Sequence, residues 1–213
     1  NNNAVYPDTR REFPCDDSAK MMKNFFTKKE FILFFTVLVT GAALLAFIYF
    51  GIYQEKGVRA FYWGGGDSGE YLALADNILA GRGFSIHREE PYEIGSTRTP
   101  GYPIIVAGAK LLGGAYGDLL LIVFQIITLG AIGVLAYRIC KQFLDETASF
   151  VLSFFVVFHP QMLLVTFTVM SDIFFMLFFL LSFFYFLLFL ERHETGKWLA
   201  SSLWLGVATV IRP

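Results

Sequence analysis

The sequence is poor in the residues that usually build metal centres and disulfide frameworks. Its 213 residues include only two cysteines and three histidines. Cys15 lies in a polar stretch and Cys140 near the end of an apolar run, so their spacing favours neither a disulfide framework nor a cysteine-ligated metal. His87, His159 and His193 are scattered along the chain. A histidine-based metal site therefore has little support.

Charged residues are also scarce, and none of them form a dense basic tract. Lysine and arginine total 17, aspartate and glutamate total 18, and charged residues make up 16% of the chain. A soluble domain usually has about 25% charged residues. Nucleic-acid binding requires a concentrated basic surface, so we expect no nucleic-acid partner.

The apolar fraction is high instead. Hydrophobic residues make up 55% of the chain, with 25 phenylalanines and a mean hydropathy of +0.55. Several apolar runs exceed the ~18 residues that indicate a membrane-spanning segment. Because only helices and closed barrels can cross a bilayer, the sequence predicts an all-α integral membrane protein with a multi-span helical bundle.

The apolar runs divide the chain into a tail, a set of spans and one long polar interval. Residues 1–29 are polar and predict a disordered cytoplasmic tail, and residues 30–213 predict the N-terminal part of a larger transmembrane domain, with the natural start at Met21 or Met22. His159-Pro160 interrupts the third span, because proline breaks the helical hydrogen-bond ladder. About five spans are predicted, at 31–53, 118–140, 147–169, 172–190 and 198–213, with an outer loop at 54–117.

The positive charges set the predicted orientation. Cytoplasmic flanks and short loops of membrane proteins carry an excess of lysine and arginine. The first span is preceded by four lysines and the later turns carry two further basic pairs, at Lys20, Lys23, Lys28 and Lys29, at Arg138 and Lys141, and at Arg192 and Lys197. The N-terminus is therefore predicted in the cytoplasm, and the loop at 54–117 outside it.

The outer loop carries two short helical patterns. Leu72, Ala75, Ile78 and Leu79 recur at helical spacing, which predicts a helix lying on the membrane with its apolar side down. A second short helix is predicted from Pro103 through residue 112, closed by the glycines at 113 and 114. Neither is long enough to cross the bilayer.

Ionisable residues from three distant segments share the outer face in this topology, and ionisable groups at such positions often mark a functional site. Asp67 could act as a general base or a metal ligand, or it could cap its helix with Glu70 completing a capping box. Asp172 could likewise be only a helix cap. Arg98 and Arg212 could bind a lipid phosphate or act as interface anchors.

A glycine pattern in the same loop is only a weak match to a dinucleotide site. Gly64, Gly66 and Gly69 match G-x-G-x-x-G, but no strand–helix–strand unit surrounds them. Asp67 would also repel a pyrophosphate at the helix N-terminus.

The outer loop taken as a whole resembles that of the GT-C membrane glycosyltransferases, most closely glycosyltransferase family 39, the dolichyl-phosphate-mannose-protein mannosyltransferase and aminoarabinose-transferase-like group. The resemblance covers roughly residues 28–213. It is carried by Asp67-x-x-x-Tyr71, Ala75, Asn77-Ile78-Leu79, Gly81-x-Gly83-Phe84, Arg98-x-Pro100-Gly101-Tyr102-Pro103, Pro160, Ser171-Asp172 and Leu205-Gly206-x-Ala208-Thr209-x-x-Arg212-Pro213.

The resemblance implies an inverting enzyme that transfers a sugar from a polyprenyl-phosphate donor to a protein, lipid or glycan acceptor outside the cytoplasm, in a bacterial inner membrane rather than the endoplasmic reticulum. Asp67 would activate the acceptor hydroxyl. Arg98 and Arg212 would bind the carrier phosphate, with Glu70 and Tyr71 at the same site. Asp172 stands where the family usually has glutamate. No cofactor is certain, and a divalent metal at Asp67 and Asp172 is left open.

The family's remaining helices and C-terminal outer domain lie outside this sequence, so we expect the 213 residues to be inactive alone. Two other interpretations remain beside the transferase. A transporter or flippase-like protein for a lipid-linked sugar would need the arginines but no base. A structural membrane subunit would need Asp67 and Asp172 only for folding.

Overall fold

The computed structural model describes residues 27–62, 66–92, 94 and 98–212. Of the predicted tail at residues 1–29, residues 1–26 lie outside the described residues, as do Gly64 and Gly65. Residues 27–29 are not disordered, because they form the capped start of the first helix. Within the described part the chain forms helices and no strand. This agrees with the all-α membrane fold expected from the sequence.

The first helix, α2 (Lys28–Ile48), begins at a capping box. The Thr27 hydroxyl accepts a hydrogen bond from the Glu30 backbone N–H, and the Thr27 N–H donates to the Glu30 carboxylate at 2.7 Å. Glu30 is buried and also accepts from Arg138 Nε at 2.7 Å, which joins α2 to α6. The helical path continues through a π-helical turn (Tyr49–Tyr53), α3 (Gln54–Lys56) and a 3₁₀ turn (Gly57–Phe61).

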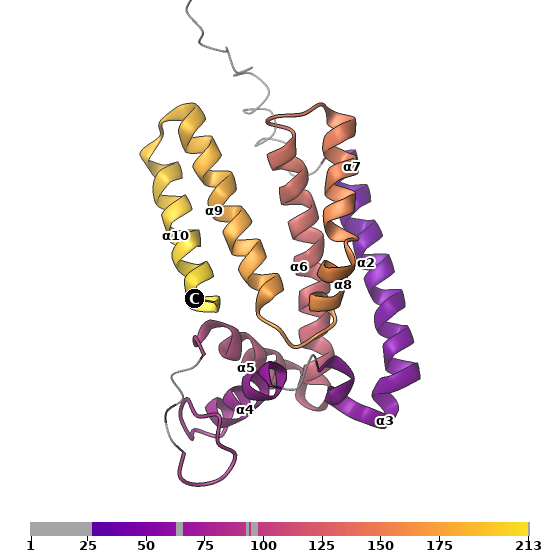
Figure 1. Ribbon diagram of the computed structural model, residues 1–213, viewed down its shortest axis with the longest axis vertical. Helices are drawn as coiled ribbons and strands as arrows, with labels where there is room; N and C mark the ends of the chain where they lie inside the picture. Colours follow the sequence, from indigo (N-terminus) through magenta and orange to yellow (C-terminus); the bar gives the residue numbers. More distant parts are fainter. Residues whose placement is uncertain (1–26, 63–65, 93, 95–97, 213) are drawn as a thin grey trace, which may run out of the picture.

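The later helices run back and forth between the two ends of the bundle, with two consecutive short helices making up one of the passes (Figure 1). They are α6 (Gly117–Cys140), α7 (Glu146–Val157), α8 (Pro160–Thr166), α9 (Asp172–Arg192) and α10 (Thr195–Ile211). Helices α7 and α8 meet at a bend of 52°, because Pro160 cannot continue the hydrogen-bond ladder of α7. Helix α6 contacts α2, α5, α7 and α9, and it is therefore the central helix.

Within the described residues, three helical stretches are long and apolar enough to cross a membrane, namely Lys28–Phe61, Gly101–Cys140 and Asp172–Arg192. The bent α7–α8 pair adds a fourth if it is taken as one broken span. Helix α10 has 17 residues and is shorter than these stretches. The predicted total of about five spans therefore stays a prediction.

Helices α4 (Asp67–Leu79) and α5 (Gly101–Gly113) lie across one end of the bundle, near the end of α10 and the start of α9 (Figure 1). The prediction that α4 lays its apolar side on the membrane is wrong for Leu72 and Ala75, whereas Leu79 at the end of the helix is 44% exposed. Leu72 and Ala75 are buried inside the protein, because α4 packs against α5. Helix α5 carries the exposed apolar side chains instead, with Leu111 and Leu112 about three-quarters exposed.

Glycines make the sharp turn from α5 into α6. Gly114 has a φ of +53°, a conformation that residues with a Cβ rarely adopt. A Cβ on Gly117 would lie 2.5 Å from the Cα of Lys110. The turn therefore holds the end of α5 directly against the start of α6, and this contact fixes α5 across the end of the bundle.

Candidate active site

One arginine bridges two carboxylates at the start of α4. The Arg98 side chain donates to Asp67 through Nη2 and to Glu70 Oε2 through Nε, the latter at 2.7 Å. Residues three apart lie on the same face of a helix, so one guanidinium can reach both. Asp67 is the first residue of α4, and the Glu70 N–H donates to the carbonyl of Gly66. The alternative that Asp67 and Glu70 form a capping box is therefore wrong.

Tyr71 lies beneath this ion-pair cluster. The Arg98 guanidinium carbon stands 5.3 Å from the centre of the Tyr71 ring, within range of a cation–π contact. Partial burial tends to lower the pKa of Arg98, but its hydrogen bonds to Glu70 and Asp67 raise the pKa above its usual value. The positive charge is therefore held beside the two carboxylates at any physiological pH.

A second carboxylate–arginine pair forms where α9 begins and α10 ends. Arg212 donates to Asp172 through Nη1. The residue before α9, Ser171, makes no side-chain capping bond, and Asp172 is the first helical residue. The alternative that Asp172 is only a helix cap is therefore wrong as well. Its second oxygen, Oδ2, is buried and has no hydrogen-bond partner in the described part of the chain.

Hydrogen bonds between the segments join the two pairs into one region. The Tyr71 and Ser171 hydroxyls lie 3.2 Å apart. The Thr99 hydroxyl donates to the carbonyl of Ile211 at 2.9 Å. The Ser68 hydroxyl donates to the carbonyl of Val169 at 3.1 Å. We call this meeting point of the α4 start, residues 98–101, residues 169–172 and the α10 end the junction.

The junction contains every site residue that the sequence singled out. These are Asp67, Glu70, Tyr71, Arg98, Asp172 and Arg212. Side-chain exposure is 46% for Asp67 and 30% for Asp172, so both carboxylates can be reached from outside the fold. The convergence that the topology predicted is present, and the chemical role of each residue stays a prediction.

Sequence reasoning missed the residues that hold the junction together. Ser68, Thr99 and Gln125 each make hydrogen bonds to backbone carbonyls of distant segments. Serine and threonine leave no distinctive sequence signal. Gln125 does, because an amide inside an apolar membrane helix needs buried partners.

A metal ion finds no prepared ligand set in the described part of the chain. No group of three or more histidine, cysteine, aspartate or glutamate side chains gathers there. Asp67 and Asp172 each face a guanidinium, which would oppose a nearby cation. A divalent metal at these aspartates stays a prediction.

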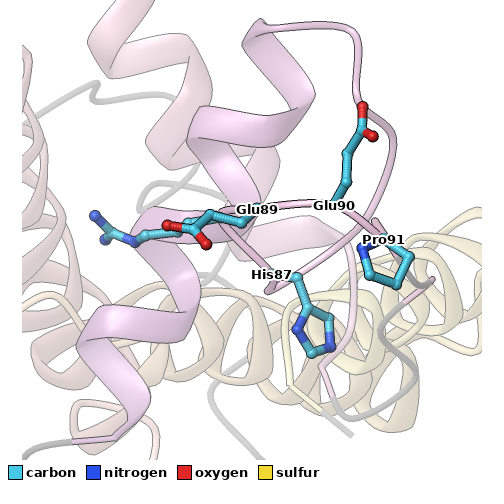
Figure 2. Close-up of a pocket in the computed structure, with 5 residues that line it drawn as sticks. His87, Glu89, Glu90 and Pro91 are labelled. Carbon is cyan, nitrogen blue, oxygen red and sulfur yellow. The ribbon is translucent and has the colours of Figure 1, made fainter.

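A separate hollow lies in the loop after α4 and is lined by residues 87–91. Figure 2 shows that the His87 ring and the carboxylates of Glu89 and Glu90 point in different directions. All three residues are exposed. Asn77 fixes the start of this loop by donating to the carbonyls of Ser85 and His87 at 2.6 and 2.8 Å. The hollow contains none of the predicted site residues.

A family model described as dolichyl-phosphate-mannose-protein mannosyltransferase matches residues 97–213, more than half of the chain. The chain belongs to this family. The matched part contains Arg98, Asp172 and Arg212, whereas Asp67 and Glu70 precede it. No curated protein and no solved structure matches the chain.

Membership of the mannosyltransferase family agrees with the fold and with the charge pairs. The chain is a GT-C-type membrane glycosyltransferase of family 39 character. The family implies a polyprenyl-phosphate-linked sugar as the donor and a membrane as the setting. A charged junction at the end of apolar helices is suited to such a donor, whose headgroup is anionic and whose chain is apolar.

Proposed function

We propose that this protein transfers a sugar from a polyprenyl-phosphate donor to a hydroxyl group of a protein, lipid or glycan acceptor on the extracytoplasmic face, with inversion at the anomeric carbon. The observation that carries the proposal is the pairing of two partly exposed carboxylates with two arginines at one end of an apolar bundle. Such a site offers both a base for the acceptor and cations for the donor phosphate.

Asp67 is the residue we assign to the acceptor. Its carboxylate takes the proton of the acceptor hydroxyl, and the acceptor oxygen attacks the anomeric carbon from the face opposite the phosphate. The bond between that carbon and the phosphate oxygen breaks, and polyprenyl phosphate leaves with the electron pair. Asp67 then releases its proton to water, which its partial exposure permits.

The two arginines suit the charge that develops on the leaving phosphate. A guanidinium has five N–H donors in a planar fork. Arg98 uses Nε and Nη2 for Glu70 and Asp67, and Arg212 uses Nη1 for Asp172. The remaining donors can bind phosphate oxygens without releasing the carboxylates. Both arginines would then stabilise the departing phosphate as its charge grows.

The charge at the other end of the bundle supports the proposed extracytoplasmic location. The two short connections at that end and the helix ends beside them carry Arg138, Lys141, Arg192 and Lys197. Short loops rich in lysine and arginine stay in the cytoplasm. The junction, at the opposite end of the same helices, would then face outward (Figure 1).

The proposal is tested with the full-length protein in proteoliposomes and a radiolabelled polyprenyl-phosphate sugar. We expect wild-type protein to release polyprenyl phosphate and to form a glycoside whose anomeric configuration is opposite to that of the donor. Retention of configuration would contradict the assignment of Asp67 as a base for direct displacement.

The same assay separates the rival functions. A transporter would bind the donor, and move it between leaflets, without releasing polyprenyl phosphate. A structural subunit would neither bind nor cleave it. Either result would contradict the proposal that the protein is a glycosyltransferase.

A further inference from the structure

Gln125 lies in the middle of the central helix α6 and is fully buried. Its neighbours along the helix, from Leu119 to Phe124 and at Ile126 and Ile127, are all apolar. Burying an amide in apolar surroundings costs free energy unless all of its polar atoms find partners. The hydrogen-bond partners of the Gln125 amide therefore show which parts of the fold it holds in place.

The amide of Gln125 connects two separate parts of the fold. Its oxygen accepts a hydrogen bond from the Tyr102 hydroxyl at 3.1 Å. Its nitrogen donates toward the carbonyls of Val165, Thr166 and Thr168, at 3.2, 2.7 and 2.8 Å. Val165 and Thr166 are the last residues of α8, where backbone carbonyls lack partners within the helix. The Gln125 side chain thus provides hydrogen-bond partners for carbonyls at the end of α8 and for the buried Tyr102 hydroxyl.

The first of these connections leads to the Asp67 side of the junction. Tyr102 is fully buried on α5, and its ring meets the Tyr71 ring edge-on with centroids 4.7 Å apart. The Tyr71 ring supports the Arg98 guanidinium, which holds Asp67. The position of Gln125 is therefore linked, through two aromatic rings, to the carboxylate that we assign to the acceptor.

The second connection leads to the Asp172 side. The segment fixed at residues 165–168 continues directly into Val169, whose N–H donates to the carbonyl of Phe61 at 2.9 Å. Ser171 then meets the Tyr71 hydroxyl, and Asp172 follows it at the start of α9. No regular helix holds residues 167–171, so their position depends on these hydrogen bonds.

We propose that Gln125 is a positioning residue for glycosyl transfer, one that sets the separation between the Asp67–Arg98 and Asp172–Arg212 pairs by anchoring Tyr102 and residues 165–168 to the central helix. The inference rests on the proposed function, because it assigns both pairs to one reaction. Small displacements of reacting groups reduce the rate of the chemical step far more than they reduce substrate binding.

The test compares three substitutions with one matched control in the full-length protein. Gln125→Leu removes both connections. Tyr102→Phe removes the hydroxyl, which bonds to Gln125 and also contacts the Met170 backbone, while keeping the ring contact. Gln125→Glu is neutral when buried and keeps the acceptor and one donor. The control is Thr128→Val on the same helix, since within the described residues the Thr128 hydroxyl bonds only to the carbonyl of Phe124.

We expect kcat to fall about tenfold to a hundredfold in Gln125→Leu, with the donor KM changed by less than about threefold. Tyr102→Phe and Gln125→Glu should lie between this variant and wild type, and Thr128→Val should match wild type. Hydrogen exchange of the peptide covering residues 165–172 should quicken in Gln125→Leu and stay unchanged in the control.

Two results would overturn the inference. One is wild-type kcat and wild-type exchange at residues 165–172 in a folded Gln125→Leu protein. The other is wild-type kcat in both Tyr102→Phe and Gln125→Glu, which decides the matter if Gln125→Leu does not fold. Absence of transfer in the wild type would instead defeat the proposed function, and hydrogen exchange would still decide whether Gln125 anchors the segment.

Discussion

Arg98 is the residue on which the geometry of the site most depends. It joins two carboxylates of α4 and lies over an aromatic ring of the same helix. The planar fork of a guanidinium can make these contacts together, whereas the ammonium of lysine is a point charge with different geometry. The residue therefore does more than supply a positive charge.

The first prediction concerns the geometry of this fork. Arg98→Lys keeps the charge and loses the simultaneous bonds to Asp67 and Glu70, so we expect kcat/KM to fall about tenfold or more. Steady-state release of polyprenyl phosphate measures the change. Arg82→Lys is the matched control, because Arg82 lies over the Tyr92 ring in the same outer loop and outside the junction. Equal activity of Arg98→Lys and wild type would show that only the charge matters.

At the scale of elements, glycine decides how closely α5 approaches α10. A Cβ on Gly101 would lie 2.6 Å from the carbonyl oxygen of Val210 and 2.9 Å from Ile211 Cδ1. The same contact brings residues 98–101 beside the end of α10, which carries Arg212. The short distance between the two arginine segments thus depends on the absence of a side chain.

The second prediction follows from that contact. Gly101→Ala should lower the thermal midpoint in detergent and reduce turnover, because overpacking against backbone costs about 1–3 kcal/mol. Gly108→Ala in the same helix meets nothing within 4 Å and should be neutral or slightly stabilising. Equal thermal midpoints for the two alanine variants would contradict the close approach of Gly101 to the end of α10.

Helix α7 gives a third prediction, on pH. The Asp145 carboxylate accepts hydrogen bonds from the N–H groups of Thr147 and Ala148 at 2.9 and 3.1 Å. The bonds from Ala148 and Thr147 lower the pKa of Asp145. A lowered folded-state pKa gives stability above the unfolded value of about 3.9 that is lost as the pH falls through the folded value.

We therefore expect Asp145→Ala to lower the thermal midpoint at pH 7 and the difference from wild type to shrink below about pH 4. Midpoints measured across this range provide the test. Glu194→Ala serves as the control, because Glu194 precedes α10 without making a capping bond. A difference between Asp145→Ala and wild type that did not change with pH would contradict the ionic origin of the cap.

The sequence predicted the elements better than their contacts. Long apolar runs placed α2, α6, α9 and α10, and the proline at 160 predicted the break between α7 and α8. The surface helix failed because periodicity shows that α4 has an apolar side but not what covers it. The covering element, α5, comes about 20 residues later and can be identified only from the folded chain.

The site was predictable in its members but not in its pairing. The alternation of the predicted spans put Asp67, Glu70, Asp172 and Arg212 on one face. The charge of Arg98 and Arg212 suggested that they bind a lipid phosphate. Which arginine faces which carboxylate depends on side-chain geometry that spacing does not encode. Gln125 stands out in the sequence as an amide inside an apolar helix, but its partners lie 23 to 43 residues away and spacing does not identify them.

At the scale of the whole molecule, the proposed extracytoplasmic site requires the junction to face one side of the membrane. The connections near Lys141 and Arg192 must then face the other side. A fourth prediction tests this with single cysteines in a background from which Cys15 and Cys140 have been replaced. Glu89→Cys should react with a membrane-impermeant maleimide on intact cells, and Glu194→Cys should react only after permeabilisation. Both positions are exposed. The reverse pattern of labelling would contradict the extracytoplasmic site.

The most direct test of the central claim is the single-turnover rate of Asp67→Asn with saturating donor and acceptor in proteoliposomes. Loss of a general base typically costs about 10²- to 10⁴-fold. We predict a fall of that size with the donor Kd within about threefold of wild type. Asp76→Asn, an exposed position on the same helix paired with Lys110, should keep the wild-type rate. An unchanged rate in Asp67→Asn would contradict the claim that this carboxylate performs the chemistry.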